Sequence, residues 1–248
     1  MTAALELEGF TVFRGATPVV HDVDLAVEAG EVVALVGRNG SGRTSLLEGV
    51  AGLHRQSGGL RCHGTSLARA SPRGRLRSGL ALCPEGRSLF AGMTVWENLL
   101  LGGYAMPRAT ALVRATDLLA RVPLLAERKS QKAGSMSGGE QQVLAFCRAL
   151  MSEPRVMLLD EPTAGLGATY RNLIGDLVVE SARRGRAVML SDGDLDFAVG
   201  LADRLVGMTG GRAAFELKGD QHPSAALVLE RLLAAERAPE AAERTHDD

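Results

Sequence analysis

The sequence predicts an α/β fold in which helices surround a buried, mostly parallel β-sheet. The first observation is a set of short and continuously apolar runs, the pattern of strands that are buried on both faces. These runs are Val32 to Val36, Leu80 to Cys83, Val156 to Leu159 and Ala187 to Leu190. The second observation is that the segments between the runs carry apolar residues at helical spacing, as expected for the connections between parallel strands.

Length and composition suit one large domain of this class. The chain has 248 residues and a formal net charge of -1, so no global field attracts nucleic acid or anionic lipid. Its opening ten residues lack the pattern of a leader peptide, and no apolar run is long enough to cross a membrane. We therefore expect a cytoplasmic protein that has no nucleic-acid partner and that reaches a membrane only through another protein.

The remaining elements follow in chain order. Residues 22–28 alternate between apolar and polar and predict a half-buried strand of an antiparallel opening sheet. Apolar residues at helical spacing after a glycine-rich stretch predict a helix over residues 46–53. Residues 93–134 are mostly helical in pattern, and Thr94 with Glu97 forms a capping box. Residues 205–217 predict a hairpin around two glycines.

The three cysteines and two clusters of arginines do not indicate a binding or catalytic site. The three cysteines lie far apart without metal-ligand or redox spacing, so we interpret them as reduced packing residues. Two arginine clusters precede predicted strands, and we expect solvated helix faces there rather than contacts with nucleic acid. The clusters are Arg69, Arg73, Arg75 and Arg77, and Arg183, Arg184 and Arg186.

The stretch GRNGSGRTS at residues 37–45 joins the first apolar run to a helix and has the composition of a phosphate-binding loop. Glycines allow successive backbone amides to converge on phosphate oxygens, and the helix adds its positive N-terminal end. Thr44 stands where a hydroxyl would bind the Mg²⁺ of a nucleotide, and Arg43 stands where a cation would reach the phosphates. A glycine-rich turn without a ligand is the alternative. The candidate binding residues are Gly37, Arg38, Asn39, Gly40, Ser41, Gly42, Arg43, Thr44 and Ser45.

Two carboxylates end the third apolar run, at the position where open α/β sheets bind their ligands. We expect Asp160 to hold Mg²⁺ and Glu161 to accept a proton from an attacking water. The alternative is an acidic pair that only forms a turn.

The stretch MSGGEQQ at residues 136–142 begins another helix, which Ser137 can cap with Glu140 completing the box. Gly138 and Gly139 are unfavourable in a helix, so we expect a close backbone approach there, most naturally by a second anion. One chain cannot bring both of these sites to one phosphate. A plain capped helix is the alternative.

Together the phosphate loop, SGGEQQ and LLDEP resemble the ATP-binding subunits of ABC transporters, over residues 1 to about 235. The stretches PEGRSLF, MTVWENLLLGGY and SGGEQQVLAFCRALMSEP resemble the branched-chain amino acid importer subunits of the LivF type. The resemblance implies a P-loop NTPase core of the RecA-like kind, with an N-terminal antiparallel β subdomain and an inserted helical subdomain. This helical subdomain would span about residues 87–135 and dock on transmembrane permease subunits. For residues 236–248, composition predicts a disordered tail.

The same resemblance implies the cofactors ATP and Mg²⁺, bound between two ATP-binding subunits that pair head to tail. Ser137, Gly138 and Gly139 would then serve the nucleotide of the partner. Glu85 would lie in the loop that senses Mg²⁺, which Thr44 and Asp160 would also bind. The residue that stacks on adenine would be Phe13 or Arg14, with the spacing favouring Arg14.

Arg43 and Gly193 depart from the pattern of that family. Arg43 stands in place of lysine, and its planar fork cannot occupy the narrow lysine position unchanged. Gly193 falls where the family has a histidine or glutamine, and it offers no side chain to the terminal phosphate. Gly167 likewise falls where many members have an aspartate. The LivF type often lacks that aspartate too, so it is Arg43 and Gly193 that predict hydrolysis at a reduced rate, although a tolerated exchange at Arg43 would leave it unchanged.

The sequence thus predicts an ATPase subunit of an importer for branched-chain amino acids or related polar solutes, at the cytoplasmic face of the membrane. Its expected partners are permease subunits, a second ATP-binding subunit and, indirectly, a solute-binding protein. Two alternatives stay open: a hydrolysis-deficient subunit that completes the active site of a second ATPase subunit, and an ATPase subunit for export.

Overall fold

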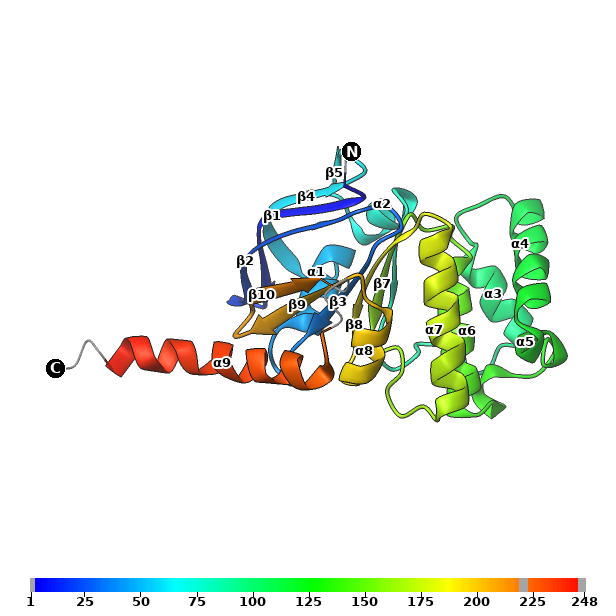
Figure 1. The fold of residues 1–248 in the computed structure, drawn as a ribbon. Coiled ribbons are helices and arrows are strands. Elements are labelled where there is room, and N and C mark those ends of the chain that lie inside the picture. Colours follow the sequence, from blue (N-terminus) through cyan, green and yellow to red (C-terminus); the bar gives the residue numbers. More distant parts are fainter. Residues whose placement is uncertain (1–2, 219–222, 245–248) are drawn as a thin grey trace.

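The computed structural model describes residues 3–218 and 223–244, and its strands form two sheets (Figure 1). The larger sheet has the strand order β10-β9-β3-β8-β7-β6, in which every pairing is parallel except that of β9 with β10. Its strands are β3 (Val32–Val36), β6 (Leu80–Cys83), β7 (Val156–Asp160), β8 (Ala187–Ser191), β9 (Arg204–Thr209) and β10 (Arg212–Lys218). The predicted α/β class with a buried parallel sheet is therefore confirmed.

The larger sheet is covered on both faces because successive side chains of a strand point to opposite sides. Along β3, Val32, Ala34 and Val36 join one apolar cluster, while Val33 and Leu35 join the other. The first cluster includes α6 (Gly138–Leu150), α7 (Ala168–Arg183) and α8 (Leu195–Leu201). The second includes α1 (Arg43–Ala51) and the smaller sheet. This double covering explains why these strands are continuously apolar.

The smaller sheet is antiparallel, with the strand order β2-β1-β4-β5. Its strands are β1 (Leu5–Arg14), β2 (Thr17–Val27), β4 (Arg55–Cys62) and β5 (Thr65–Ser66). In β2 the side chains of Val23, Leu25 and Val27 are buried, and those of the residues between them are exposed. The alternating pattern at residues 22–28 therefore predicted this opening sheet correctly.

The prediction of a helix up to Leu53 was too long. Helix α1 ends at Ala51, because Gly52 follows with a left-handed φ of 85° and its amide bonds back to the last turn. Leu53 lies beyond this cap and is 54% exposed, so it does not belong to the apolar face of the helix.

The helices within residues 87–135 are α3 (Val95–Gly102), α4 (Arg108–Arg121), α5 (Pro123–Glu127) and the 3₁₀ turn η1 (Ala133–Ser135). Figure 1 shows α3, α4 and α5 beyond α6 and α7 as seen from the sheets. Thr94 accepts the amide of Glu97 and the Glu97 carboxylate accepts the amide of Thr94, which confirms the predicted capping box. Phe90, which precedes this group of helices, is 53% exposed and not part of the core.

The C-terminal part contains the predicted hairpin, in which β9 and β10 are joined by Gly210 and Gly211. Both glycines have positive φ, 51° and 75°, which suits the tight turn between two strands. Helix α9 (Ala225–Arg244) follows. It continues past residue 236, where the composition predicts a disordered tail; residues 245–248 lie outside the described residues. Alanine, glutamate and arginine are strong helix formers, which accounts for the continued helix.

The three cysteines are buried and free, as the sequence predicted. Burial raises the pKa of Cys83 and of Cys147 to about 12, so both thiols stay protonated and act as packing groups. In contrast, the expectation of a solvated arginine face was wrong for Arg75 of α2 (Pro72–Arg77), which is buried. Its guanidinium donates to the Gly49 and Val50 carbonyls at 2.7 and 2.8 Å. It thereby supplements the Gly52 amide, which also donates to the Gly49 carbonyl, at the end of α1, where carbonyls lack enough partners within the helix.

Candidate functional site

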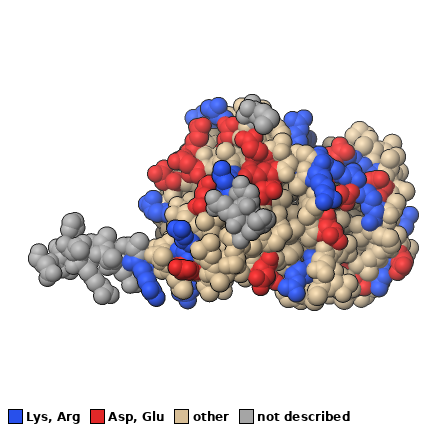
Figure 2. Space-filling model, viewed as in Figure 1, with Lys and Arg blue, Asp and Glu red and all other residues tan. Residues whose placement is uncertain are grey.

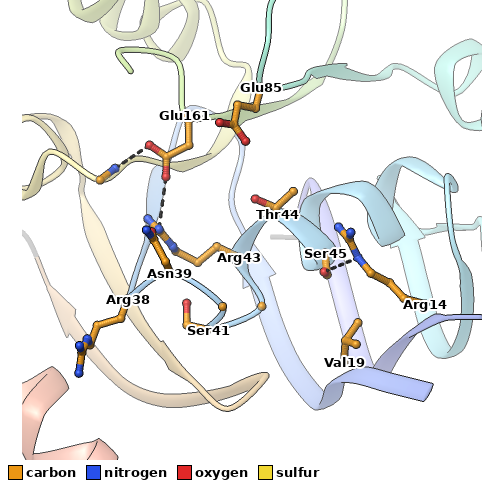
Figure 3. Close-up of a pocket in the computed structure, with 13 residues that line it drawn as sticks. Arg14, Val19, Arg38, Asn39, Ser41, Arg43, Thr44, Ser45, Glu85 and Glu161 are labelled. Carbon is orange, nitrogen blue, oxygen red and sulfur yellow. Dashed lines mark hydrogen bonds and ion pairs between the residues drawn. The ribbon is translucent and has the colours of Figure 1, made fainter. Parts of the chain in front are cut away.

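The phosphate loop connects β3 to α1 and lines a cavity of about 650 Å³ at the carboxyl end of the larger sheet. Three positions of the loop require glycine, two because of their backbone conformation and one because of a close backbone contact. Gly40 and Gly42 have φ of 85° and 103°, and a Cβ on Gly37 would lie 2.4 Å from the Met208 carbonyl oxygen. Every residue from Arg38 to Ser45 lines the cavity, whereas Gly37 lies behind them. The turn therefore opens onto the cavity along almost its whole length (Figure 3).

Hydrogen-bond donors of this loop are free to meet an anion. The first intrahelical bond of α1 runs from the Leu46 amide to the Gly42 carbonyl, so the amides of Arg43, Thr44 and Ser45 have no partner within the helix. The Ser41 hydroxyl oxygen is buried and has no hydrogen-bond partner among the described residues. Free donors and the positive end of the helix dipole fit the phosphates of a nucleotide.

Asp160 contacts Thr44 of the phosphate loop, and of these two residues only Thr44 lines the cavity. The Thr44 hydroxyl donates to Asp160 Oδ1 at 3.1 Å, and the Ser191 hydroxyl donates to the same oxygen at 2.6 Å. Asp160 is 1% exposed, and Glu85 lies at the rim of the cavity. The described residues contain no group of three or more metal-binding side chains, so a Mg²⁺ ion held by Thr44 and Asp160 would also need phosphate oxygens as ligands.

Glu161 follows Asp160 and points into the same cavity, with a strained φ of 46°. The Gly193 amide donates to its Oε2 at 2.9 Å, and Arg43 Nη2 lies 3.3 Å from its Oε1 (Figure 3). Burial raises the pKa of Glu161 above its usual value, although the Gly193 amide and the Arg43 charge partly oppose this rise. A carboxylate with a raised pKa suits a general base.

Arg43 does not project freely into the phosphate loop. Besides the contact with Glu161, its Nη1 donates to the Asp192 carbonyl oxygen at 3.0 Å. Its side chain is only 8% exposed. The longer arginine fork therefore reaches across the cavity, binds the proposed base and fixes it to the segment after β8.

The segment after β8 contains functional residues that sequence analysis missed. The Asp192 carboxylate accepts from the Thr163 amide and hydroxyl at 3.1 and 2.6 Å, and from the Asp194 amide at 2.9 Å. These bonds hold the chain beside Glu161 so that the Gly193 amide can reach it. An acidic Asp-Gly-Asp sequence directly after a buried strand is the signal that could have indicated this role. Gly167, the other predicted departure, is the N-cap of α7 and does not line the cavity.

The structure distinguishes between the two candidates for stacking on the nucleobase. Arg14 lines the cavity and is held by Ser45 Oγ at 3.1 Å and Glu48 Oε2 at 2.7 Å. Phe13 does not line it, and the Arg55 guanidinium lies 3.8 Å from the centre of its ring. The spacing argument that favoured Arg14 agrees with this placement. Arg38 turns away from the loop toward α9 and pairs with Glu236 at 3.2 Å (Figure 3).

Ser137, Gly138 and Gly139 begin α6 and do not line the cavity. Ser137 caps the helix, and Glu140 completes the predicted capping box. A Cβ on Gly139 would lie 2.2 Å from the Tyr170 ring, and one on Gly138 would lie 2.9 Å from Arg87 Nη2. The close approach predicted for these glycines therefore has partners within the chain, and the start of α6 is separate from the phosphate loop.

The fold and the cavity together define a P-loop nucleotide-binding protein of the α/β class. Comparison with known proteins identifies the family, since the family model described as ABC transporter matches residues 20–164. The chain therefore belongs to the ABC transporter family and is an ATPase of the transport-coupled kind.

The similar proteins of known name are import and transport subunits. The chain is 38% identical to the high-affinity branched-chain amino acid transport ATP-binding protein BraG of Pseudomonas aeruginosa, over 84% of this chain and 90% of that protein. It is 32% identical to a probable branched-chain amino acid transport ATP-binding protein LivF of Archaeoglobus fulgidus, over 79% and 84%. It is 35% identical to the phosphonates import ATP-binding protein PhnC of Frankia casuarinae, over 92% and 96%. The chain is accordingly an ATP-binding subunit of the importer type.

Solved structures agree with the fold. One described as an ATP-binding subunit of an ABC transporter has a TM-score of 0.81 at 26% identity, covering 93% of this chain and 99% of that one. A nucleotide-free ATP-binding cassette has a TM-score of 0.79 at 22% identity, covering 94% and 95%. Among the residues that the structure describes, no helix is both long and apolar enough to cross a membrane.

Proposed function

We propose that this chain binds Mg-ATP as a subunit of an importer for branched-chain amino acids or related polar solutes. It would act at the cytoplasmic face of the membrane, bound to transmembrane permease subunits that receive solute from a solute-binding protein. The similarity to BraG and LivF supports this solute class. The similarity to a phosphonate importer is nearly as high, so the solute needs a direct test.

The nucleotide site rests on one observation above all: the free donors of the phosphate loop and the Glu161 carboxylate line a single cavity, and Asp160 is bonded to Thr44 of the same loop. The loop amides would bind the phosphates, and Thr44 and Asp160 would hold Mg²⁺, which would neutralise phosphate charge. Glu161 would accept the proton of the attacking water. The Arg14 guanidinium, held in place by Glu48, would offer its planar face to the base.

Uptake of labelled solute tests this proposal. The chain is reconstituted with its permease subunits and its solute-binding protein in vesicles loaded with Mg-ATP, and uptake of leucine, sulfate and a phosphonate is compared. Glu161→Gln is the matched control, because it keeps the cavity but removes the base. We expect Glu161-dependent uptake of leucine. Uptake of sulfate or phosphonate alone would refute the proposed solute class. Transport of solute out of the compartment that contains Mg-ATP would indicate an exporter.

A second candidate function is favoured by the contact between Arg43 and Glu161. Arg43 binds the carboxylate of Glu161, which would hinder hydrolysis in this chain. The start of α6 is capped and could still bind the nucleotide of a second subunit. In this version the chain hydrolyses ATP poorly and completes the active site of a second ATP-binding subunit. Mixing this chain with its partner subunit tests it: Ser137→Asp here, which can still cap α6 but repels a phosphate, should abolish ATP turnover by the partner, whereas Glu161→Gln here should not.

A further inference from the structure

A second cluster of charged side chains lies far from the phosphate loop, at the amino ends of β7 and β8. There the end of α4, the loop after α6 and the end of α7 enclose a cavity of about 60 Å³. Arg184 and Arg186, from a cluster predicted to be solvated, line it together with Arg114 and Arg121 of α4. We call it the arginine cavity. The arginine cavity is separate from the nucleotide site, with which it shares no lining residue.

Two arginines that line the arginine cavity each have a hydrogen-bond donor without an acceptor among the described residues. Arg121 Nε and Arg186 Nη1 are buried and have no partner among the described residues. Both side chains are fixed by their other nitrogens: Arg121 Nη2 lies 2.8 Å from Glu180 Oε1, and Arg186 Nε donates to the Pro154 carbonyl at 3.1 Å. A buried donor without an acceptor is unfavourable, so the structure favours an acceptor in this place.

Charge distinguishes an anion from a water molecule as that acceptor. Asp117 lies 3.6 Å from Arg121, Glu153 pairs with Arg114, and Glu180 lies 2.8 Å from Arg184. Three carboxylates thus pair with Arg114, Arg121 and Arg184, whereas Arg186 forms no ion pair with any described residue. Burial and then the neighbouring arginine charges lower the pKa of Arg186. A water molecule would supply acceptor oxygens but would not relieve this repulsion.

We propose that the arginine cavity binds one small oxyanion, such as inorganic phosphate or sulfate. The cavity volume of about 60 Å³ is twice the roughly 30 Å³ that one water molecule takes up in the liquid. Guanidinium forks also match the oxygens of a tetrahedral oxyanion. Arg114 and Arg121 come from the helical region, whereas Arg184 and Arg186 adjoin the core of the larger sheet. The oxyanion therefore ties α4 to the junction of α7 and β8.

Charged side chains around this junction are mixed rather than of one sign. Figure 2 shows Lys and Arg beside Asp and Glu over α7 and the neighbouring helices. General attraction of anions to a basic surface is therefore a poor explanation for binding here, and loss of one lining arginine should have a specific effect.

Titration calorimetry of the full chain with sodium phosphate, against sodium chloride at equal ionic strength, tests the proposal. Arg184→Gln removes an exposed lining guanidinium and should weaken one binding event about tenfold, as loss of about 1.4 kcal/mol implies. Arg183→Gln is the matched control: it removes the same charge from an exposed residue that does not line the cavity. It should leave this event unchanged. Repeating the titration with sodium sulfate should give a similar event.

Phosphate bound in the phosphate loop is separated by adding Mg-ADP, which competes there and not in the arginine cavity. Arg186→Gln is the second variant, with circular dichroism to establish that each variant is folded. Identical phosphate affinity in the parent chain, Arg184→Gln and Arg186→Gln would overturn the proposal and leave water as the occupant. The same result would say nothing against ATP binding at the loop.

Discussion

Replacing Arg43 with lysine should accelerate ATP hydrolysis, because the arginine binds the carboxylate of Glu161, the proposed base. Both oxygens of Glu161 are engaged: Arg43 Nη2 lies 3.3 Å from Oε1, and the Gly193 amide lies 2.9 Å from Oε2. Glu161 must give up the Arg43 contact before Oε1 can accept a proton from water. Lysine has one nitrogen in place of the two that Arg43 uses, so it cannot span Glu161 and the Asp192 carbonyl with separate nitrogens as the arginine fork does.

The size of the effect follows from the burial of this contact. The Arg43 and Glu161 side chains are 8% and 18% exposed, so solvent screens the contact weakly. A hydrogen bond to a charged group contributes about 1.5–3 kcal/mol net. At about 1.4 kcal/mol per factor of ten, its release should raise kcat about ten- to a hundredfold. The gain is smaller if the lysine pairs with Glu161 in turn.

Phosphate release at saturating Mg-ATP measures this effect, with kcat and KM determined separately. Arg38→Lys is the matched control, because Arg38 lines the same cavity but is 69% exposed and pairs with Glu236. It should change kcat little. An unchanged or lower kcat in Arg43→Lys, with nucleotide affinity retained, would refute the inhibitory role of the arginine and with it the explanation of reduced turnover.

Other predictions concern acidity, packing and a buried charge. Because the pKa of Glu161 is raised, kcat should fall on acidification at a higher pH than an ordinary glutamate would give, and the pH–rate profile of kcat checks this. Gly139→Ala places a Cβ against the Tyr170 ring and should lower the free energy of unfolding by about 1–3 kcal/mol in urea, whereas Gly200→Ala, with open space around it, should not. Arg75→Met removes the guanidinium bonds to the Gly49 and Val50 carbonyls, of which Gly49 keeps its bond from the Gly52 amide, and should cost about 1–3 kcal/mol. Exposed Arg73→Met should cost little by the same denaturation measurement; equal losses would contradict a capping role for Arg75.

Local patterns of the sequence were sufficient for the fold class and most elements. Continuous apolar runs predicted the parallel strands because a strand buried on both faces needs no polar side. Alternation predicted β2, and paired Thr-Glu and Ser-Glu residues predicted the starts of α3 and α6. The over-long prediction for α1 missed a local cap at Gly52, whereas the error at Arg75 arose because a distant segment decided the outcome. Arg75 was expected at the surface because the α1 carbonyls that its guanidinium binds are about 25 residues away in sequence.

For the candidate site, too, the sequence predicted the local features but not the contacts between distant residues. Sequence alone determined which residues could form a phosphate loop, because glycine, threonine and the following helix are neighbours in the chain. It also identified Arg43 and Gly193 as departures from the family pattern. It could not indicate that these two residues meet at Glu161, since the three positions are far apart along the chain and adjoin only when β3, β7 and β8 lie side by side.

Sequence by itself therefore determined the chemistry available to this protein: an anion-binding loop, two carboxylates and a second capped helix start. Tertiary structure alone decided how the charges pair. Arg43 binds Glu161, and Arg184 and Arg186 line one cavity together with two arginines of α4. The physical reason is that electrostatic interactions depend on distance and burial, and both are properties of the packed sheet and helices rather than of any local segment.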